Sequence, residues 1–250
     1  MAKLTVAGIG PGDEANMSIA CRRSLDECDV IAGYTAYIEL VQPLYPNKTY
    51  LSTGMKSEVE RCTESLRIAA NGKNVCLISS GDSGIYGMAS LVYELAVEFP
   101  AVQIEVIAGI TAASSGSAIL GSPLSHDFAV ISLSDLLTPW ELIEKRLRAA
   151  SDADFVISIY NPVSHKRKDH LKNAAAILLE AIPADRICGI AHNIGREGQD
   201  VTITTLGGLQ KDDSAERLHI DMFCCIFIGN SKSKMINGKM ITPRGYTERK

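Results

Sequence analysis

The sequence contains no apolar run of the roughly 18 residues that a membrane-spanning helix needs. Its N-terminus also lacks the basic segment, apolar core and small-residue cleavage site of a signal peptide. From these two absences we expect a cytoplasmic protein.

The sequence also lacks an excess of positive charge and the residue spacings typical of metal sites. The formal net charge is −4, and no stripe of Lys and Arg provides the phosphate contacts that a nucleic-acid surface requires. The seven cysteines form no CxxC pair, and the histidines show no metal-ligand spacing. We therefore expect no nucleic-acid partner, no metal held by the protein, and reduced thiols in the core, among them Cys76, Cys188, Cys224 and Cys225.

Two familiar phosphate-binding signatures are missing too. The glycine-rich turn GIGPGD (residues 8–13) lacks the GxGxxG spacing of dinucleotide folds, and Pro11 removes one backbone N–H donor. No GKS or GKT follows it, which excludes a Walker loop. Such a turn is a poor anion cradle, so a ligand that is neutral or cationic at this point suits it better.

The chain does contain short apolar runs that alternate with helical segments, a pattern that predicts an α/β fold with mainly parallel sheets. Helices are predicted from Ser57, with Val59, Cys62, Leu66 and Ala69 inward and Ser57 and Glu60 as a capping box, from Pro139, and over residues 164–182. The expected strands are 4–9, 75–79, 104–107, 128–132, 155–160, 187–192, 201–205 and 222–228.

The Gly- and Pro-containing segment 121–127 is the best candidate linker. It predicts an N-terminal α/β domain over 1–120 and a C-terminal α/β domain with a mixed sheet over 121–250. Three small-residue turns follow strands, at 8–13, 79–87 and 108–116. Because ligands bind at the carboxyl ends of parallel strands, we expect these turns to converge on one crevice.

Several segments carry a family resemblance that spans nearly the entire chain. GIGPGD resembles the first-strand turn of the tetrapyrrole (corrin) methylases. The carbon-17 branch of that family is resembled specifically by SGDSGIYGMA, GITAA, SHDFAVISLSDLLTPW, YNPVSHKR and ITPRGY, of which the last three are long and unusual. Ala108 departs from the pattern, because a proline is expected before the glycine of the third turn.

The resemblance implies a homodimer of chains with two α/β domains, and S-adenosylmethionine in the cleft between the domains. It implies methylation of carbon 17 of a tetrapyrrole with ring contraction and lactone formation, a step of cobalamin biosynthesis. The residues that it assigns to the cofactor are Pro11, Gly81, Asp82, Gly84, Ile85, Thr111, Ala112, Tyr160, Asn161, Asn193 and Thr242.

The same resemblance implies a reaction that moves protons and a substrate that carries acid side chains. His126, Asp127 and Asp135 are titratable groups beside the presumed cleft and are candidates for general acid or base work; a loop-fixing hydrogen bond is the plainer interpretation of His126 and Asp127. Arg61, Ser134 and Arg167 are candidates for substrate binding, and the two arginines could instead be solvated surface charges.

Two other classes of function remain open at this point. A nicotinamide-dependent oxidoreductase would use Asp29 for its ribose, and a tetrapyrrole carrier would bind the macrocycle without S-adenosylmethionine. Within the family, methylation of another carbon of the tetrapyrrole is an alternative that departs less from this assignment. The sequence does not decide between precorrin-3B, which carries no metal, and cobalt-factor III, whose cobalt belongs to the substrate.

Overall fold

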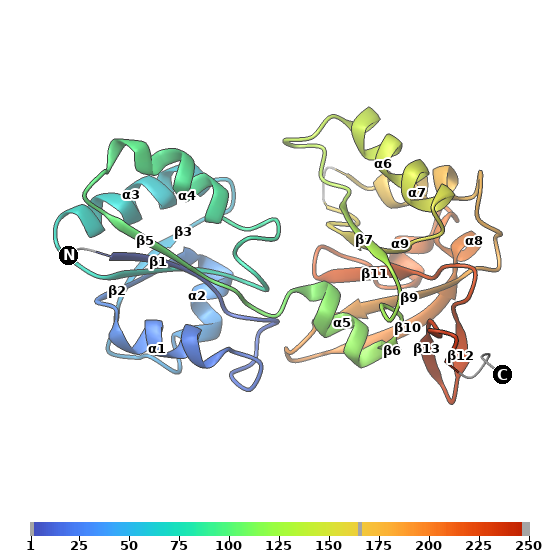
Figure 1. Cartoon of the computed structure of the whole chain (residues 1–250), viewed down its shortest axis with the longest axis horizontal. Coiled ribbons are helices and arrows are strands. Elements are labelled where there is room, and N and C mark those ends of the chain that lie inside the picture. The colour runs from blue at the N-terminus through green and yellow to red at the C-terminus, as the bar shows by residue number, and fades with distance from the viewer. Residues whose placement is uncertain (1–2, 165–166, 247–250) are drawn as a thin grey trace. The chain divides into compact units, whose positions relative to one another are not determined.

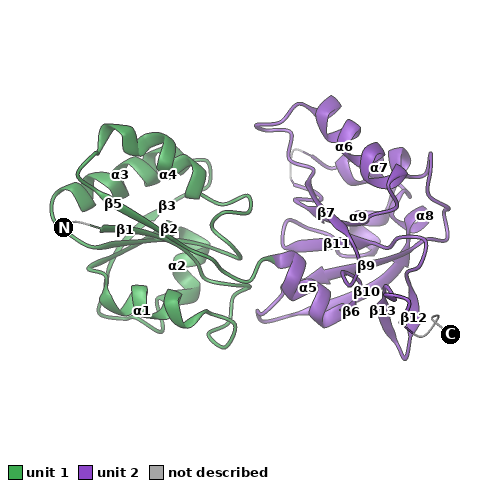
Figure 2. Ribbon diagram, in the orientation of Figure 1, with its two compact units in different colours: residues 1–111 green, residues 112–250 purple. Residues whose placement is uncertain are grey.

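The computed structural model of the chain describes residues 3–164 and 167–246. Contacts divide it into two compact units, Met1–Thr111 and Ala112–Lys250 (Figure 2). Over the described ranges, no helix has both the length and the apolar character that crossing a membrane requires.

The first unit is built on a five-stranded parallel sheet with strand order β3-β2-β4-β1-β5. Helices α1 and α2 cover one face, and α3 and α4 cover the other (Figure 1). Each face has its own apolar core, which agrees with the α/β expectation. The elements are β1 (Lys3–Gly8), α1 (Ile19–Glu27), β2 (Val30–Tyr34), α2 (Thr35–Val41), β3 (Thr49–Thr53), α3 (Glu58–Ala70), β4 (Val75–Ser79), α4 (Ala89–Leu95), a 3-10 turn (Ala96–Glu98) and β5 (Gln103–Ile107).

The second unit contains the mixed sheet expected for the C-terminal half, in the order β10-β9-β11-β8-β7. Only β7 and β8 pair in parallel, while β11 runs antiparallel to both β8 and β9. Strands β7, β8 and β9 therefore run in the same direction, and their carboxyl ends share one edge. The large strands are β7 (Phe128–Ser132), β8 (Val156–Tyr160), β9 (Ile187–His192), β10 (Asp200–Thr205) and β11 (Cys224–Ile228).

A small three-stranded sheet and five helices complete this unit within the described residues. The small sheet has the order β12-β13-β6. Its strands are β6 (Gly121–Ser122), β12 (Lys234–Ile236) and β13 (Lys239–Ile241), and the helices are α5 (Ala112–Leu120), α6 (Trp140–Asp152), α7 (His170–Leu178), α8 (Leu206–Leu209) and α9 (Ser214–Arg217).

The compact units divide earlier than the linker predicted from Gly and Pro. Helix α5 contacts β9 and β11, and a Cβ on Gly116 would lie 2.9 Å from the ring of Phe227. This tight packing places α5 with the second unit. The segment at 121–127 is thus a turn inside that unit, containing the short strand β6.

Several helix details also differ from the sequence predictions. Ser57 makes no side-chain capping bond to α3, and Pro139 precedes α6 with an extended ψ of 141° instead of occupying its first turn. The helix predicted over 164–182 is shorter, since α7 covers His170–Leu178. On α3, Val59 is 58% exposed, whereas Arg61 is buried.

Candidate functional site

Glycines from the three predicted small-residue turns meet at the carboxyl edge of the first unit's sheet. Gly10 and Gly81 exchange two backbone hydrogen bonds, at 3.1 and 2.7 Å. A Cβ on Gly109 would lie only 2.0 Å from the carbonyl oxygen of Gly81, and one on Gly8 would lie 2.5 Å from the same atom. Glycine is required at both positions because the turns touch backbone to backbone.

Asp82 fixes the geometry of the second and third turns. Its Oδ1 accepts a hydrogen bond from the Gly84 N–H at 2.7 Å, and its Oδ2 accepts one from the Gly109 N–H at 2.9 Å. The side chain of Ser83 is fully buried, and its hydroxyl lies 3.2 and 3.3 Å from the carbonyl oxygens of Val6 and Ile107. A carboxylate is therefore held rigidly at the strand ends, beside the exposed side chain of Ile85.

The first turn is ordered by its own side chains. Pro11 is buried, and the Asp13 carboxylate accepts hydrogen bonds from the backbone and side-chain amides of Asn16. Thr111 ends the first unit and is half-buried. The edge thus presents a fixed carboxylate, and Pro11 contributes no N–H, so the donor set matches a positively charged ligand better than a phosphate.

In the second unit, several predicted cofactor residues lie at the shared carboxyl edge. The hydroxyl of Tyr160, at the end of β8, accepts a hydrogen bond of 2.7 Å from the backbone N–H of Ala113 in the first turn of α5. Ala112 and Tyr160 contact the same apolar cluster. Asn161 and Asn193, which directly follow β8 and β9, have left-handed φ values of 52° and 47°. Backbone strain of this kind often accompanies function.

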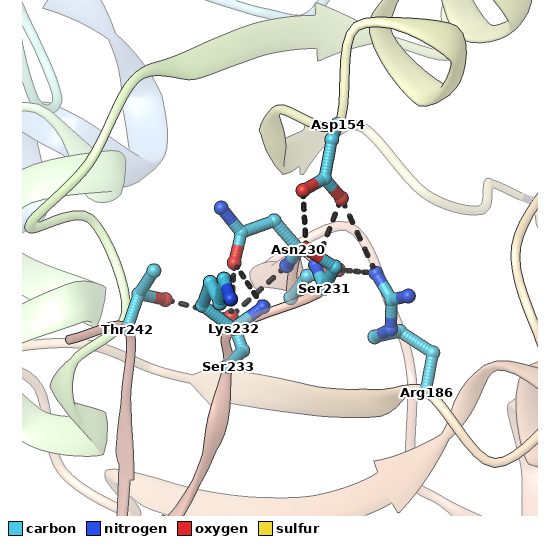
Figure 3. Close-up of polar contacts among 8 residues, drawn as sticks. Asp154, Arg186, Asn230, Ser231, Lys232, Ser233 and Thr242 are labelled. Carbon is cyan, nitrogen blue, oxygen red and sulfur yellow. Dashed lines mark hydrogen bonds and ion pairs between the residues drawn. The ribbon is translucent and has the colours of Figure 1, made fainter. Parts of the chain in front are cut away.

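The side chain of Thr242, another predicted cofactor residue, is enclosed by the protein. It is fully buried, and its hydroxyl lies 2.7 Å from the Ser233 hydroxyl (Figure 3). Ser233 in turn accepts a hydrogen bond from the Asn230 backbone N–H at 2.9 Å. Beside this network, Asp154 accepts from Ser231 and pairs with Arg186 at 3.7 Å. Thr242 thus anchors the β11–β12 turn.

A charged cluster follows the parallel strands β7 and β8. Asp135 Oδ2 lies 3.0 Å from His170 Nε2, and Asp135 Oδ1 lies 3.9 Å from Arg167 Nη1. The first pair is close but not aligned as a hydrogen bond. The neighbouring His170 lowers the pKa of Asp135.

The His170 ring is held in place by Trp140, edge to face, with ring centroids 4.8 Å apart. Ser134, which is half-buried, donates its backbone N–H to the Ser132 hydroxyl at 3.1 Å, and the Asn161 side chain donates to the same hydroxyl at 2.8 Å. Sequence reasoning assigned His170 no role. Its pairing with Asp135 arises only because β7 and β8 are neighbours in the sheet.

His126 and Asp127 lie at the opposite end of β7 from this cluster. Their side chains are 44% and 83% exposed, and the charged atoms are 3.8 Å apart. The five residues of β7 place Asp127 and Asp135 about 16 Å apart or more. The three predicted proton-transfer residues therefore form two separate groups.

Asp29 precedes β2 and accepts a hydrogen bond from the Asn74 backbone N–H at 2.8 Å. It therefore lies at the amino edge of the sheet, away from the glycine turns. A ribose-binding acid of a dinucleotide fold belongs at the carboxyl edge. The position of Asp29 argues against the oxidoreductase alternative.

All seven cysteines are free and buried, as expected. His192, Asp221 and Cys224 offer ligand atoms within 4.8 Å of one another. These groups already bond among themselves, since His192 Nε2 lies 3.3 Å from Asp221 Oδ2 and Cys224 Sγ lies 3.7 Å from Asp221 Oδ1.

Comparisons with known proteins give a consistent result. A family model described as tetrapyrrole (corrin/porphyrin) methylases matches residues 3–210. A probable cobalt-factor III C(17)-methyltransferase of Methanocaldococcus jannaschii is 49% identical over 248 residues, covering 98% of each chain. A protein of the same name from Salmonella typhimurium is 43% identical over 245 residues, covering 98% of this chain and 99% of that one. The crystal structure of the methyltransferase CobJ matches with a TM-score of 0.90 at 32% identity, covering 97% of this chain and 100% of that one.

Proposed function

We propose that this chain transfers a methyl group from S-adenosylmethionine to carbon 17 of cobalt-factor III in cobalamin biosynthesis. The observation that carries the proposal is the near full-length similarity to two proteins of that name. The chain belongs to the tetrapyrrole (corrin/porphyrin) methylases. Membership of a methyltransferase family also favours this reaction over the oxidoreductase and the tetrapyrrole carrier.

The carboxyl edge of the first sheet fits the methyl donor. S-adenosylmethionine supplies an activated methyl group on a positively charged sulfur. Asp82 places a fixed negative charge among turns that offer no phosphate cradle, and Gly81, Gly84 and Ile85 form the surface around it. We assign the methionine part of the cofactor to this turn, while contacts of Pro11, Thr111, Ala112, Tyr160, Asn161, Asn193 and Thr242 stay predictions.

Positioning accounts for much of the rate in such a reaction. Holding the two reactants in near-attack geometry can contribute about 7–11 kcal/mol. The methylated carbon of an electron-rich tetrapyrrole is already nucleophilic, so the transfer step requires no strong base. The rigid backbone contacts among Gly8, Gly81 and Gly109 suit this positioning role.

Ring contraction with lactone formation moves protons, and here we favour the cluster at the ends of β7 and β8. Asp135 and His170 are a carboxylate and an imidazole in direct contact, and Arg167 beside them offers a guanidinium to a substrate carboxylate. Ser134 adjoins the cluster and stays a candidate for substrate binding. The roles predicted for His126 and Asp127 stay predictions, to be tested beside this cluster.

The family resemblance also leads us to propose a homodimeric, cytoplasmic enzyme. Light scattering of the purified protein checks the dimer. The function itself is tested by incubating the protein with S-adenosylmethionine and either cobalt-factor III or precorrin-3B. The expected product of cobalt-factor III has gained the mass of one methyl group and contains a lactone. Conversion of precorrin-3B alone would contradict the choice of substrate, and no conversion of either would contradict the function.

A further inference from the structure

Arg61 is a buried charge without adequate partners. Its side chain is 2% exposed, and its Nε and Nη1 have no hydrogen-bond partner within the part of the chain that the structure describes. The remaining contact, from Nη2 to Glu58 Oε1, is 3.9 Å long. A buried guanidinium with unsatisfied donors is costly, because it has lost its hydration without replacement. A negatively charged group bound beside the guanidinium would offset this cost.

The position of Arg61 in α3 points it toward the strand ends. Helix α3 begins just after β3, so its first turn lies at the carboxyl edge of the first sheet. Glu60, Glu64 and Arg67 line a groove of about 350 Å³ beside β3. Arg61 and Ser65 lie on a different flank of the helix and are both buried, and α3 also packs against α4 and β4. We place the Arg61 guanidinium on the α4 side of the helix.

A second buried polar group without a partner lies on the same face of the sheet. Ser79 ends β4, is 4% exposed, and its hydroxyl has no hydrogen-bond partner among the described residues. Val75 and Leu77 pack in the core beneath α3 and α4, and strand alternation directs Ser79 to that face as well. The Arg61 guanidinium and the Ser79 hydroxyl thus lie on the same face of the first sheet and at the same edge, next to the turn that Asp82 orders.

We propose that Arg61 and Ser79 form a buried receptor for a carboxylate group, an inference that rests on the proposed function. The planar fork of arginine matches a carboxylate in bidentate fashion, and a serine hydroxyl can donate a further bond. Two ligands of the reaction carry this group, namely the methionine part of the cofactor and the acid side chains of the tetrapyrrole. Glu58, which is half exposed, covers the guanidinium loosely, and its displacement opens the receptor.

Calorimetry on matched arginine variants tests this receptor. Arg61→Met removes the charge at similar length, Arg61→Lys keeps the charge without the fork, and Arg67→Met is the control on the exposed side of the same helix. The titrants are S-adenosylhomocysteine, its decarboxylated analogue, and the tetrapyrrole. We expect Arg61→Met to bind one carboxylate ligand about tenfold more weakly or worse, with a smaller loss for Arg61→Lys and none for Arg67→Met.

The pattern of losses identifies the source of the carboxylate. A loss for S-adenosylhomocysteine that is absent for its decarboxylated analogue assigns the receptor to the cofactor, and a loss for the tetrapyrrole alone assigns it to the substrate. The ligand-free Arg61→Met protein should unfold at the same temperature as the wild type or higher, because an unpaired buried charge has been removed.

Unchanged binding of both ligands by Arg61→Met would overturn the inference, whether or not the variant is less stable. If Arg61→Met fails to fold, Ser79→Ala decides: weaker binding of one carboxylate ligand supports the receptor, and wild-type binding contradicts it. A wild-type protein that binds neither ligand refutes the proposed function instead. If the wild type is active and Arg61→Met binds both ligands as tightly as the wild type, the receptor is refuted but the proposed function is not.

Discussion

The Asp82 carboxylate and the Gly109 backbone N–H are joined by a hydrogen bond of 2.9 Å that links the turns after β4 and β5. The same carboxylate accepts from the Gly84 N–H at 2.7 Å, so both of its oxygens are engaged in shaping the candidate site. A single acid therefore serves two purposes, because it orders the turns and places a negative charge beside them.

Replacing Asp82 with asparagine should separate the turns. The amide nitrogen of asparagine would face one of the two backbone N–H groups, leaving a donor without an acceptor. We expect a loss of about 1–3 kcal/mol in the free energy of unfolding and weaker binding of S-adenosylhomocysteine. Urea unfolding and calorimetry measure the two effects. Asp185→Asn, on an exposed loop, is the control, and equal behaviour of the two variants would contradict the role of Asp82.

Gly109→Ala tests the close backbone approach directly. The new Cβ would lie 2.0 Å from the Gly81 carbonyl oxygen, which forces the turns apart. We expect a loss of about 2–4 kcal/mol in the free energy of unfolding. Gly54→Ala, where a Cβ meets no atom within 4 Å, should change stability by about 0.5 kcal/mol or less. Similar stabilities for both alanine variants would show that the turns tolerate separation.

His170→Gln should raise the pKa of Asp135. In the folded protein this pKa lies below the ordinary value of 3.8, chiefly because of His170. A carboxyl group with a lowered folded pKa contributes stability above its unfolded pKa and loses it as pH falls through the folded value. The contribution is small, since the Asp135 side chain is 39% exposed. Carboxyl NMR titration of wild type and variant measures the shift, and identical titration curves would contradict the pairing.

Cys28 should be the first cysteine to react with a thiol reagent. Its pKa is lowered, mainly by the neighbouring Cys76 thiol, whereas burial raises the pKa of Cys21 and of Cys224 to about 12. Because the thiolate is the reactive form, native protein should react slowly and at Cys28 first. Mass spectrometry after brief alkylation locates the label. Preferential labelling of Cys21 or Cys224 would contradict this ordering.

The parts of the fold that follow from local pattern were predictable. Strands β4, β7 and β9 match their predicted ranges because each is a short, largely apolar run that a polar residue precedes. Strand β3 was missed because it is an edge strand with half-exposed side chains, and β2 because Gly33 and Tyr34 interrupt its apolar run. Periodicity detects burial of apolar residues only.

For the same reason, the candidate site was predicted only in part. The glycine turns could be identified from the sequence, because few other residues permit two backbone segments to touch. The burial of Arg61 was invisible, because a helical pattern assigns Val59 to the core and a charge to the solvent, and the tertiary packing reverses both. The pairing of Asp135 with His170 depends on strand order in the sheet, which spacing along the chain does not encode.

In the function proposed above, small-residue turns at the carboxyl edge of the first sheet hold the methyl donor. A crystal structure of the protein with S-adenosylhomocysteine tests it most directly. The methionine part of the ligand should contact the turn of Gly81, Asp82, Gly84 and Ile85. A ligand bound away from that turn, or a turn filled by packed side chains in a crystal grown at saturating ligand, would contradict it.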